Sequence, residues 1–255
     1  LFQSILKSPI HISETSGLIG AAVLMGALAI ALAYVLPWIP VLGKHIDRRD
    51  HAASVQVAFR FNSYIMLALS DRIVGPQGQL MMAVLIGICV PLFNIAAVWP
   101  MTRGTQRGFV GELVRNPLIV ATVLGLCCNF LGMSIPAVVE PIFSRISAAS
   151  LALGLMAAGA GLQIGQLHRN KLLSISVLSI RHLIQPLMAF GLAKAFQLDQ
   201  PQTIVLMLLS ASPTASSCYV LAARMGYNGP YVAGLVSLST ILGMLSLPFA
   251  LGLVM

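Results

Sequence analysis

The sequence predicts an all-α polytopic membrane protein, and three observations lead to that fold class. The 255 residues are 58% hydrophobic and only 9% charged, with a mean hydropathy of +0.91, a balance that fits no class of soluble domain. Apolar runs recur along the chain, and each is long enough to cross a bilayer as a helix. Backbone polar groups in lipid must be satisfied internally, and the runs are too long and continuous for barrel strands, so the spans are helices.

Eight full spans can be placed on the hydropathy pattern. The chain starts at Leu1 without a Met, and residues 1–7 resemble the end of a further span whose beginning is missing. Both visible ends of the chain are expected on the outer side of the membrane, as the loop charges indicate. The predicted spans are residues 15–38, 53–73, 79–101, 115–134, 139–164, 172–196, 202–224 and 230–254.

Lysine and arginine in the short loops predict the orientation of these spans. Cytoplasmic loops carry an excess of these residues, so the loops after the first, third, fifth and seventh spans are predicted to be cytoplasmic. The formal net charge of +8 comes from basic residues scattered between apolar runs, so no nucleic-acid interface is expected. The richer loops hold nine cations (Lys44, Arg48, Arg49, Arg103, Arg107, Arg115, Arg169, Lys171 and Arg224) against three in the alternate loops (Lys7, Arg72 and Lys194).

A proline within a cluster of hydroxyls interrupts the seventh predicted span. Pro213 removes a backbone donor and clashes with the carbonyl four residues back, so a helix cannot pass through it undisturbed. It can instead be the first residue of a new half-helix with Ser212 as its N-cap. Such an N-terminus near the membrane midplane would present free N–H groups to an anion. The alternative is a proline-kinked helix whose serines bond to their own backbone.

Two triplets of spans share one layout at an offset of about 150 residues. The middle span of each triplet has polar residues at its centre, within residues 59–64 in the first and residues 212–214 in the second. The triplets enter from opposite sides of the membrane, and interrupted spans at matching positions of an inverted repeat indicate a secondary transporter. Two spans precede the second triplet, so the complete protein is expected to have ten spans in two repeats of five.

Ionisable residues within the spans indicate the charge of the substrate. Arg60, Arg181 and His182 lie inside predicted spans, whereas no Asp or Glu lies near the centre of one, which favours an anion. Alternatively, Arg60 caps broken helix carbonyls, and Arg181 and His182 contact the cytoplasmic or scaffold face. Asn62 is either a half-helix N-cap or an amide satisfied by its own helix. No cofactor is expected, and both sodium and proton coupling stay open, because broken-helix carbonyls can ligate sodium.

At these residues the sequence resembles the auxin efflux carrier family of membrane transporters, in the bile/arsenite/riboflavin transporter superfamily. Its bacterial members include malonate and malate permeases. The resemblance covers nearly the whole chain. It is carried by residues 59–64, Val90-Pro91-Leu92-Phe93-Asn94, residues 115–119 with Gly125 and Ile135-Pro136, residues 158–162, Ser212-Pro213-Thr214-Ala215 with Leu221-Ala222, and Ser239-Thr240 with Leu247-Pro248.

The resemblance implies an elevator-type carrier whose fourth and ninth spans cross as broken helices. Asn62 and Pro213 fall at the two crossover positions, with a substrate carboxylate beside them. The first crossover has no proline, so its break is expected to be milder than in plant members, and the acidic sodium-ligand cluster of related bile-acid carriers is not visible. The resemblance also implies a scaffold and a mobile transport domain. The scaffold comprises residues 1–14, which are the end of a truncated span and an outer loop, and the two spans at 102–170; the transport domain comprises residues 15–101 and 171–255. Dimers would form through the scaffold.

The sequence therefore predicts a bacterial inner-membrane carrier for a small organic anion, a mono- or dicarboxylate. A sodium-coupled bile-acid-type symporter and an amino-acid exporter are alternatives on the same layout. An ion channel fits less well, because a channel gives no reason for an inverted repeat. An intramembrane enzyme fits less well, because the spans show neither two catalytic Asp at depth nor a nucleophile with a partnering base. The candidate substrate-binding residues are Ser212, Pro213 and Thr214 at one interruption, Asn62 at the other, Arg60 as added charge or a brace, and Ser210, Ser216 and Tyr64 as weaker hydroxyl contacts.

Overall fold

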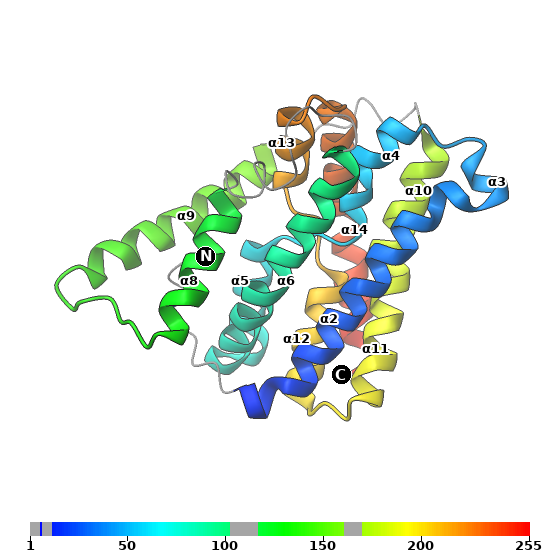
Figure 1. The fold of residues 1–255 in the computed structure, drawn as a ribbon. Coiled ribbons are helices and arrows are strands. Elements are labelled where there is room, and N and C mark those ends of the chain that lie inside the picture. Colours follow the sequence, from blue (N-terminus) through cyan, green and yellow to red (C-terminus); the bar gives the residue numbers. More distant parts are fainter. Residues whose placement is uncertain (1–5, 7–11, 103–116, 161–169) are drawn as a thin grey trace.

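The protein is helical throughout the part that the structure, a computed structural model, describes: residue 6 and residues 12–102, 117–160 and 170–255 (Figure 1). The helices, in chain order, are α2 (Ile12–Val35), η1 (Leu36–Trp38), α3 (Pro40–Gly43), α4 (Arg48–Ser54), η2 (Val55–Ala58), α5 (Ser63–Val74), α6 (Pro76–Thr102), α8 (Pro117–Phe130), α9 (Glu140–Ala160), α10 (Lys171–Ser179), η3 (Ile180–Ile184), α11 (Gln185–Ala195), α12 (Gln200–Ala211), α13 (Ser217–Arg224) and α14 (Gly229–Gly252).

Four continuous helical segments of the described chain are long and apolar enough to cross a membrane. They coincide with the first, third, sixth and eighth predicted spans, and they are Thr15–Trp38, Pro76–Thr102, Lys171–Ala195 and Gly229–Gly252. Helices α8 and α9 occupy the fourth and fifth predicted spans and lie to one side of the bundle, where they contact α6 and α5 (Figure 1). The predicted span end at residues 1–7, apart from residue 6, lies outside the described residues. So do four cations of the richer loops, Arg103, Arg107, Arg115 and Arg169.

The second and seventh predicted spans are both interrupted helices. In the second, η2 ends at Ala58 and α5 begins at Ser63 after Asn62, whose side chain accepts hydrogen bonds from the first turn. In the seventh, α12 ends at Ala211 and α13 begins only at Ser217. Local chemistry accounts for both breaks: an amide oxygen that competes for helical donors at Asn62, and a missing donor at Pro213.

The start of the second half-helix differs from the prediction. Ser212 is not its N-cap and Pro213 is not its first residue; Ser212 is instead the C-cap of α12, with an extended backbone (φ −62°, ψ 149°). Ser216 precedes α13 and makes no side-chain capping bond. The segment between the two helices is extended because its backbone is bonded to the other interruption.

The two interruptions lie side by side and are bonded backbone to backbone. Phe61 and Thr214 form an isolated antiparallel β-bridge. The Asn62 N–H donates to the Pro213 carbonyl (2.9 Å), and the Ala215 N–H donates to the Arg60 carbonyl (3.3 Å). The chain therefore passes through the two interruptions in opposite directions. We call residues 60–62 and 212–216 the paired segments.

A π-helical turn widens the sixth predicted span before Pro186. The Gln185 N–H donates to the Ile180 carbonyl, five residues back. A proline within a helix removes one N–H and crowds the carbonyl four residues earlier, and a π-turn is one way for a helix to absorb this without ending. The span stays continuous from α10 to α11, in agreement with the kink that Gln185-Pro186 predicts.

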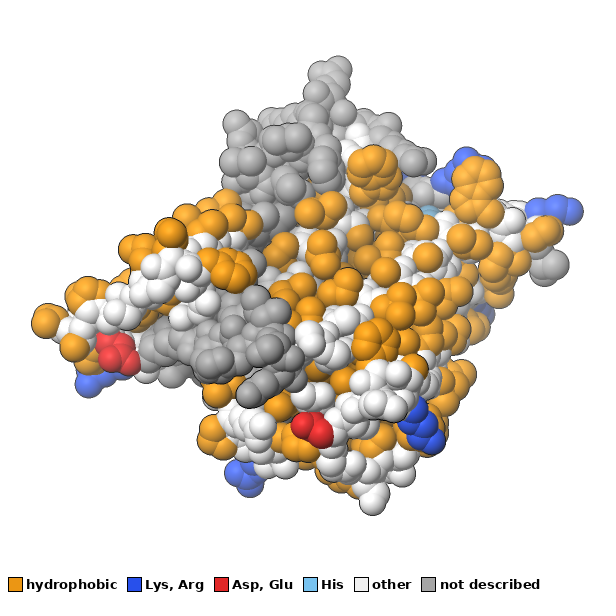
Figure 2. All heavy atoms as spheres, turned by 60° about the horizontal axis from the view of Figure 1, so that its bottom comes forward, with side chains coloured by type: hydrophobic (Ala, Val, Ile, Leu, Met, Phe, Trp, Pro, Cys, Tyr) orange, Lys and Arg blue, Asp and Glu red, His pale blue; other side chains and the backbone are white. Residues whose placement is uncertain are grey.

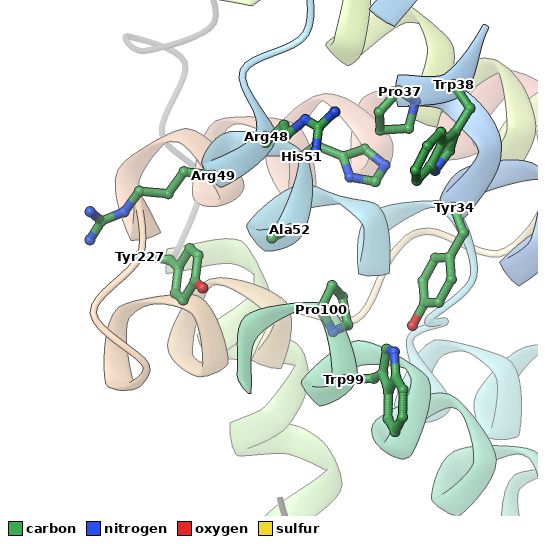
Figure 3. Close-up of a pocket in the computed structure, with 10 residues that line it drawn as sticks. All are labelled: Tyr34, Pro37, Trp38, Arg48, Arg49, His51, Ala52, Trp99, Pro100 and Tyr227. Carbon is green, nitrogen blue, oxygen red and sulfur yellow. The ribbon is translucent and has the colours of Figure 1, made fainter. Parts of the chain in front are cut away.

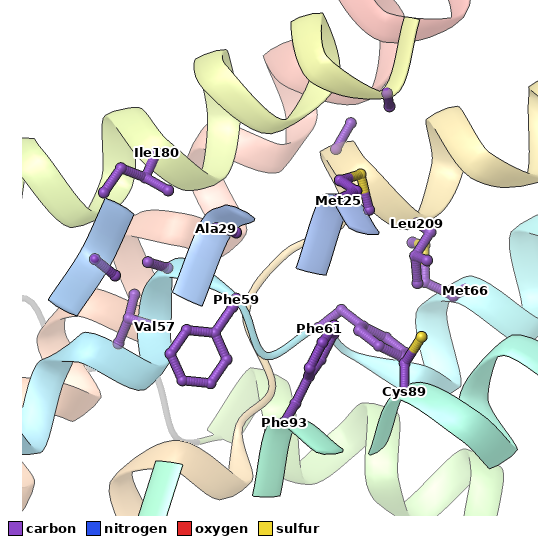
Figure 4. Packing of buried hydrophobic residues seen from close by; sticks show 14 of the residues in the cluster. Met25, Ala29, Val57, Phe59, Phe61, Met66, Cys89, Phe93, Ile180 and Leu209 are labelled. Atoms are coloured by element: carbon purple, nitrogen blue, oxygen red, sulfur yellow. The ribbon is translucent and has the colours of Figure 1, made fainter. Parts of the chain in front are cut away.

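Aromatic rings pack against the first paired segment. The Phe93 ring of α6 makes edge contacts with Phe59 and Phe61, each at 5.9 Å between centroids (Figure 4). All three side chains are at least 95% buried. By contrast, α2 presents a row of exposed leucines on its outer face, and one whole face of the molecule is largely hydrophobic, with its few charges near the edges (Figure 2). Such a surface suits a lipid environment.

Loops of the predicted cytoplasmic set meet at one end of the bundle. The Arg49 Nη2 donates to the Gly226 carbonyl (2.8 Å), the Tyr227 hydroxyl donates to the Met101 carbonyl (3.0 Å), and Asn170 bonds to Asp50. These contacts join parts of the loops after the first, third, fifth and seventh spans. Which side of the membrane this end occupies stays a prediction.

We expect Gly26→Ala to destabilise the protein. A Cβ at this position would lie 2.4 Å from two atoms of the Phe93 ring, which Phe59 and Phe61 hold on its other side. Overpacking of this kind costs about 1–3 kcal/mol, so the unfolding temperature in detergent should fall. Gly191→Ala is the control, because no atom lies within 4 Å of its added Cβ and a helical Gly→Ala change alone gains about 0.5–1 kcal/mol. Equal unfolding temperatures in the two variants would contradict the packing argument.

Candidate functional site

Asn62 caps the helix that leaves the first paired segment. Its Oδ1 accepts hydrogen bonds from the N–H groups of Tyr64 (3.1 Å) and Ile65 (3.3 Å). The residue is 96% buried, and no described residue bonds to its amide nitrogen. The predicted N-cap is therefore confirmed, and the side chain keeps two N–H donors that its own helix does not use.

Arg60 braces the start of α13 from the first paired segment. Its Nη1 donates to Gln56 Oε1 (2.6 Å) and its Nη2 donates to Ser217 Oγ (2.8 Å). Gln56 in turn donates to the Cys218 carbonyl (3.2 Å). The guanidinium thus does not cap broken helix carbonyls, which was one alternative for it, but ties the second half-helix to the first interruption.

Arg181 closes the broken end of α12. Its Nε donates to the Ser212 carbonyl (2.8 Å), its Nη2 to the Leu209 carbonyl (2.9 Å) and to Ser212 Oγ, and its Nη1 to Gln185 Oε1 (2.6 Å). A cation at a helix C-terminus is stabilised by the helix dipole and satisfies carbonyls that lack an intrahelical partner. Arg181 thus bonds to the second paired segment, and His182 bonds to two serines of α14. The alternative, a contact of both side chains with the cytoplasmic or scaffold face, depends on a scaffold division that stays a prediction.

The site is cationic and lacks a local counter-charge. Arg181 is 99% buried and Arg60 is 94% buried. Neither guanidinium contacts a carboxylate within the described chain; their partners are amide, hydroxyl and carbonyl oxygens. Buried charges without an opposite charge are costly, so these two cations create a positive potential that an anion would relieve.

Thr214 links the second paired segment to both η2 and α14. Its N–H donates to Ser239 Oγ (2.9 Å), and its hydroxyl donates to the Val57 carbonyl (2.8 Å). Ser239 donates to Thr214 Oγ1 (3.0 Å) and also bonds to His182 Nε2 (2.8 Å). A Cβ on Gly243, one turn further along α14, would lie 2.7 Å from Pro213 Cγ, so α14 contacts the paired segment closely enough to need a glycine there.

The remaining predicted hydroxyls are less directly placed. Ser210 donates to the Met207 carbonyl (2.7 Å) and Ser212 to the Leu209 carbonyl (3.2 Å), which is the back-bonding that the proline-kink alternative anticipates. Ser216, the last residue of the second paired segment, and Tyr64, two residues after the first, are half-buried. The structure therefore brings Arg60, Asn62, Ser212, Pro213 and Thr214 together at the pairing, and leaves Ser210 within α12.

Several polar residues near the paired segments had no predicted role. Gln56 and Gln185 each lie four residues from a buried arginine. This spacing within an apolar helix is the sequence signal that could have indicated a Gln–Arg pair. Asn94 follows Phe93, and its buried Nδ2 has no hydrogen-bond partner in the part of the chain that the structure describes; the same holds for the Ser54 hydroxyl. Unsatisfied buried groups are rare in native proteins and call for a bound ligand or water, so Asn94 joins the candidate site residues.

A separate pocket of about 470 Å³ opens at the end where the loops meet (Figure 3). Tyr34 and Trp99 lie on one side of it, and Arg48, His51 and Trp38 on the other. The Arg48 guanidinium stands 5.9 Å from the centroid of the Trp38 ring, an arrangement that fixes a cation through the ring face. The pocket is lined by the ends of α2, α4 and α6 and does not include the paired segments.

We expect Arg181→Lys to lower the unfolding temperature sharply. A lysine has no planar fork and cannot satisfy the four acceptors that Arg181 now bonds; each buried acceptor left unsatisfied costs about 1–3 kcal/mol. Arg145→Lys on α9, where the side chain is exposed, is the matched control and should unfold like the unmodified protein. If Arg181→Lys melted no lower than Arg145→Lys, the closure of α12 by Arg181 would be unsupported.

Comparisons with known proteins identify the family of the chain. No curated protein matches the chain. A family model described as a membrane transport protein matches residues 12–251, which include both paired segments. The members of this family are membrane transporters and not enzymes. The chain therefore belongs to the auxin efflux carrier family of membrane transport proteins.

Proposed function

We propose that this transporter is a secondary carrier for a small organic anion, a mono- or dicarboxylate, which binds beside the paired segments. The observation that carries the proposal is the pair of buried guanidiniums, Arg60 and Arg181, whose partners within the described chain are all uncharged. A carboxylate bound nearby would supply the missing negative charge.

Two helix N-termini support the same choice of substrate. Helix α5 begins at Ser63 and α13 at Ser217, one beside each paired segment, and the positive end of a helix dipole attracts an anion. The Asn62 amide nitrogen and the unpartnered Asn94 Nδ2 would donate to carboxylate oxygens. Thr214, Ser212, Ser216 and Tyr64 are proposed as further contacts, and Pro213 as the residue that keeps the segment open.

Alternating access would follow from the division of the chain. We propose ten spans in an inverted repeat, of which eight are visible, with the interrupted spans crossing at the paired segments. Residues 15–101 and 171–255 would form the mobile transport domain, and residues 1–14 and 102–170 the scaffold, through which two copies would associate. Movement of the transport domain against the scaffold would carry the site across a bacterial inner membrane. Support comes from the opposite chain directions at the bridge and from the lateral position of α8 and α9.

The pocket at the loop end would serve as an entrance for the anion. Arg48 and Arg49 lie at its rim, and cationic residues at the mouth of a cleft raise the local concentration of anions. Tyr34, Trp38 and Trp99 are also part of its lining, and they would contact the apolar part of an organic anion. The alternative sodium-coupled symporter would need oxygen ligands for a cation, whereas the nearest charged groups, Arg60 and Arg181, would repel one.

A screen of small molecules tests the substrate class. Purified protein would be heated with short monocarboxylates, dicarboxylates, amino acids and inorganic cations, with and without sodium. We expect carboxylates to raise the unfolding temperature, because they bind the native state only, and cations to have no effect. The carboxylate with the largest shift would then be tested for uptake into proteoliposomes. A response to cations alone, or to zwitterionic amino acids rather than carboxylates, would contradict the proposal.

We expect Asn62→Asp to abolish uptake while the protein stays folded. Aspartate retains an acceptor oxygen in the position of Oδ1, which caps α5, but it places a negative charge where the carboxylate would bind. Like charges brought together cost several kcal/mol, and every 1.4 kcal/mol is tenfold in affinity, so uptake should fall by at least about tenfold. Asn62→Ser is the matched control, since it retains a cap without a charge, and it should transport better than Asn62→Asp.

Pro213→Ala tests the other interruption. Alanine restores the backbone donor and permits α12 to continue, so the paired segment should lose its extended form. The fractional loss of uptake should then exceed the fractional loss of protein from the membrane. Undiminished uptake in both Asn62→Asp and Pro213→Ala would remove the paired segments as the binding site.

A further inference from the structure

His182 lies between two serines of α14 and has a bond on each ring nitrogen. Nδ1 lies 2.8 Å from Ser246 Oγ, and Nε2 lies 2.8 Å from Ser239 Oγ. The side chain is 91% buried in the π-helical turn η3. Through Ser239 it reaches Thr214 in the second paired segment, and through Ser246 it reaches the Ala211 carbonyl at the broken end of α12 (3.0 Å).

The hydroxyl protons around His182 are already in use. Each hydroxyl has one proton to donate. Thr214 gives its proton to the Val57 carbonyl, Ser239 gives its own to Thr214 Oγ1, and Ser246 gives its own to the Ala211 carbonyl. Both serine oxygens must then accept from the ring of His182. All these bonds exist together only when both ring nitrogens carry a proton, which makes the ring an imidazolium cation.

Loss of that proton would break one link to the paired segment. A neutral ring has one N–H and one lone pair. Either Ser246 turns its proton from the Ala211 carbonyl to Nδ1, or Ser239 turns its proton from Thr214 to Nε2. The first releases a carbonyl at the broken end of α12, and the second loosens α14 from the paired segment. The protonation state of His182 is thus connected to the backbone at which we place the substrate.

The charge next to His182 favours joint binding of a proton and an anion. The elements packed around η3 are α2, α10, α11, α12, α14 and η2. Among their described side chains, the ionisable ones are Tyr34, Lys171, Lys194 and Tyr231, near the ends of their helices, and Arg60 follows η2. Arg181 is adjacent in sequence, so protonated His182 would be a second positive charge beside its guanidinium. This second charge needs a counter-ion, and an organic anion at the paired segments would be one.

We propose that His182 is the proton-binding site of this carrier and that its proton and the organic anion stabilise each other's binding, so that the two move together as a proton–anion symport. The inference rests on the proposed anion function and deepens it. It needs no carboxylate in the membrane, because the substrate itself neutralises the added charge.

Direct counting of protons tests this proposal. The carboxylate that gives the largest thermal shift would be added to detergent-purified protein in weak buffer at pH 6.5, with a pH-sensitive dye as the readout. We expect uptake of about one proton for each anion bound, and affinity for the anion that weakens towards tenfold per unit of rising pH, as linkage of one proton requires. His182→Gln, which keeps a polar side chain but cannot take a proton, should abolish the uptake and flatten the pH dependence.

Two variants on α14 keep the test valid if His182→Gln does not fold. Ser246→Ala removes the acceptor for Nδ1, so it should take up fewer protons per anion at pH 6.5. Thr240→Val is the matched control on the same helix: the Thr240 hydroxyl donates to the Val236 carbonyl of its own helix (2.9 Å), so proton uptake should match that of the unmodified protein.

The outcomes separate the two proposals. Anion binding without proton uptake in the unmodified protein, or uptake that is unchanged in both His182→Gln and Ser246→Ala, overturns the assignment of His182 while the anion carrier stands. If no carboxylate of the screen binds, the proposed function fails and the proton site fails with it. Uptake that disappears in His182→Gln, falls in Ser246→Ala and persists in Thr240→Val supports a proton carried by His182.

Discussion

Two helix ends inside an apolar bundle leave backbone groups that must find partners, and the arrangement around the paired segments meets that demand. An unpaired N–H or carbonyl costs free energy comparable to a lost hydrogen bond, and in lipid no water is at hand to replace it. The Asn62 N–H bonds to the Pro213 carbonyl and the Ala215 N–H to the Arg60 carbonyl. Each interruption thereby satisfies part of the other, and neither would be stable alone at that depth.

Two arginines with glutamine partners hold the helix ends beside the paired segments. Gln56 and Arg60 on one side, and Arg181 and Gln185 on the other, are both separated by four residues and joined at 2.6 Å, in reversed order along the chain. Arg60 bonds to the start of α13 and Arg181 to the end of α12. Because the partners are neutral oxygens, the bonds fix the guanidiniums without neutralising them. The positive potential therefore remains available to a ligand, which an arginine paired with an aspartate would not allow.

The hydroxyls of α14 give the same region a second type of connection. Ser239 and Ser246 stand on either side of Gly243, the residue that approaches Pro213, and both bond to His182. Their protons can be redirected by rotation of a single bond, whereas the arginine contacts cannot change without moving a charge. A site that combines fixed cations with rotatable hydroxyls can hold an anion firmly and still respond to one proton.

The sequence by itself determined the membrane class, the positions of both interruptions and the cap at Asn62. These follow from composition and from chemistry within a few residues: continuous apolar runs, a proline without a donor, and an amide oxygen beside free N–H groups. Long-range packing places the start of α13 at Ser217 and not at Pro213, directs Arg181 to the end of α12 and directs His182 to the serines of α14. The extended backbone from Ser212 to Thr214 depends on bonds to a segment about 150 residues earlier in the sequence. Such contacts are formed by packing and leave no local signal in the chain.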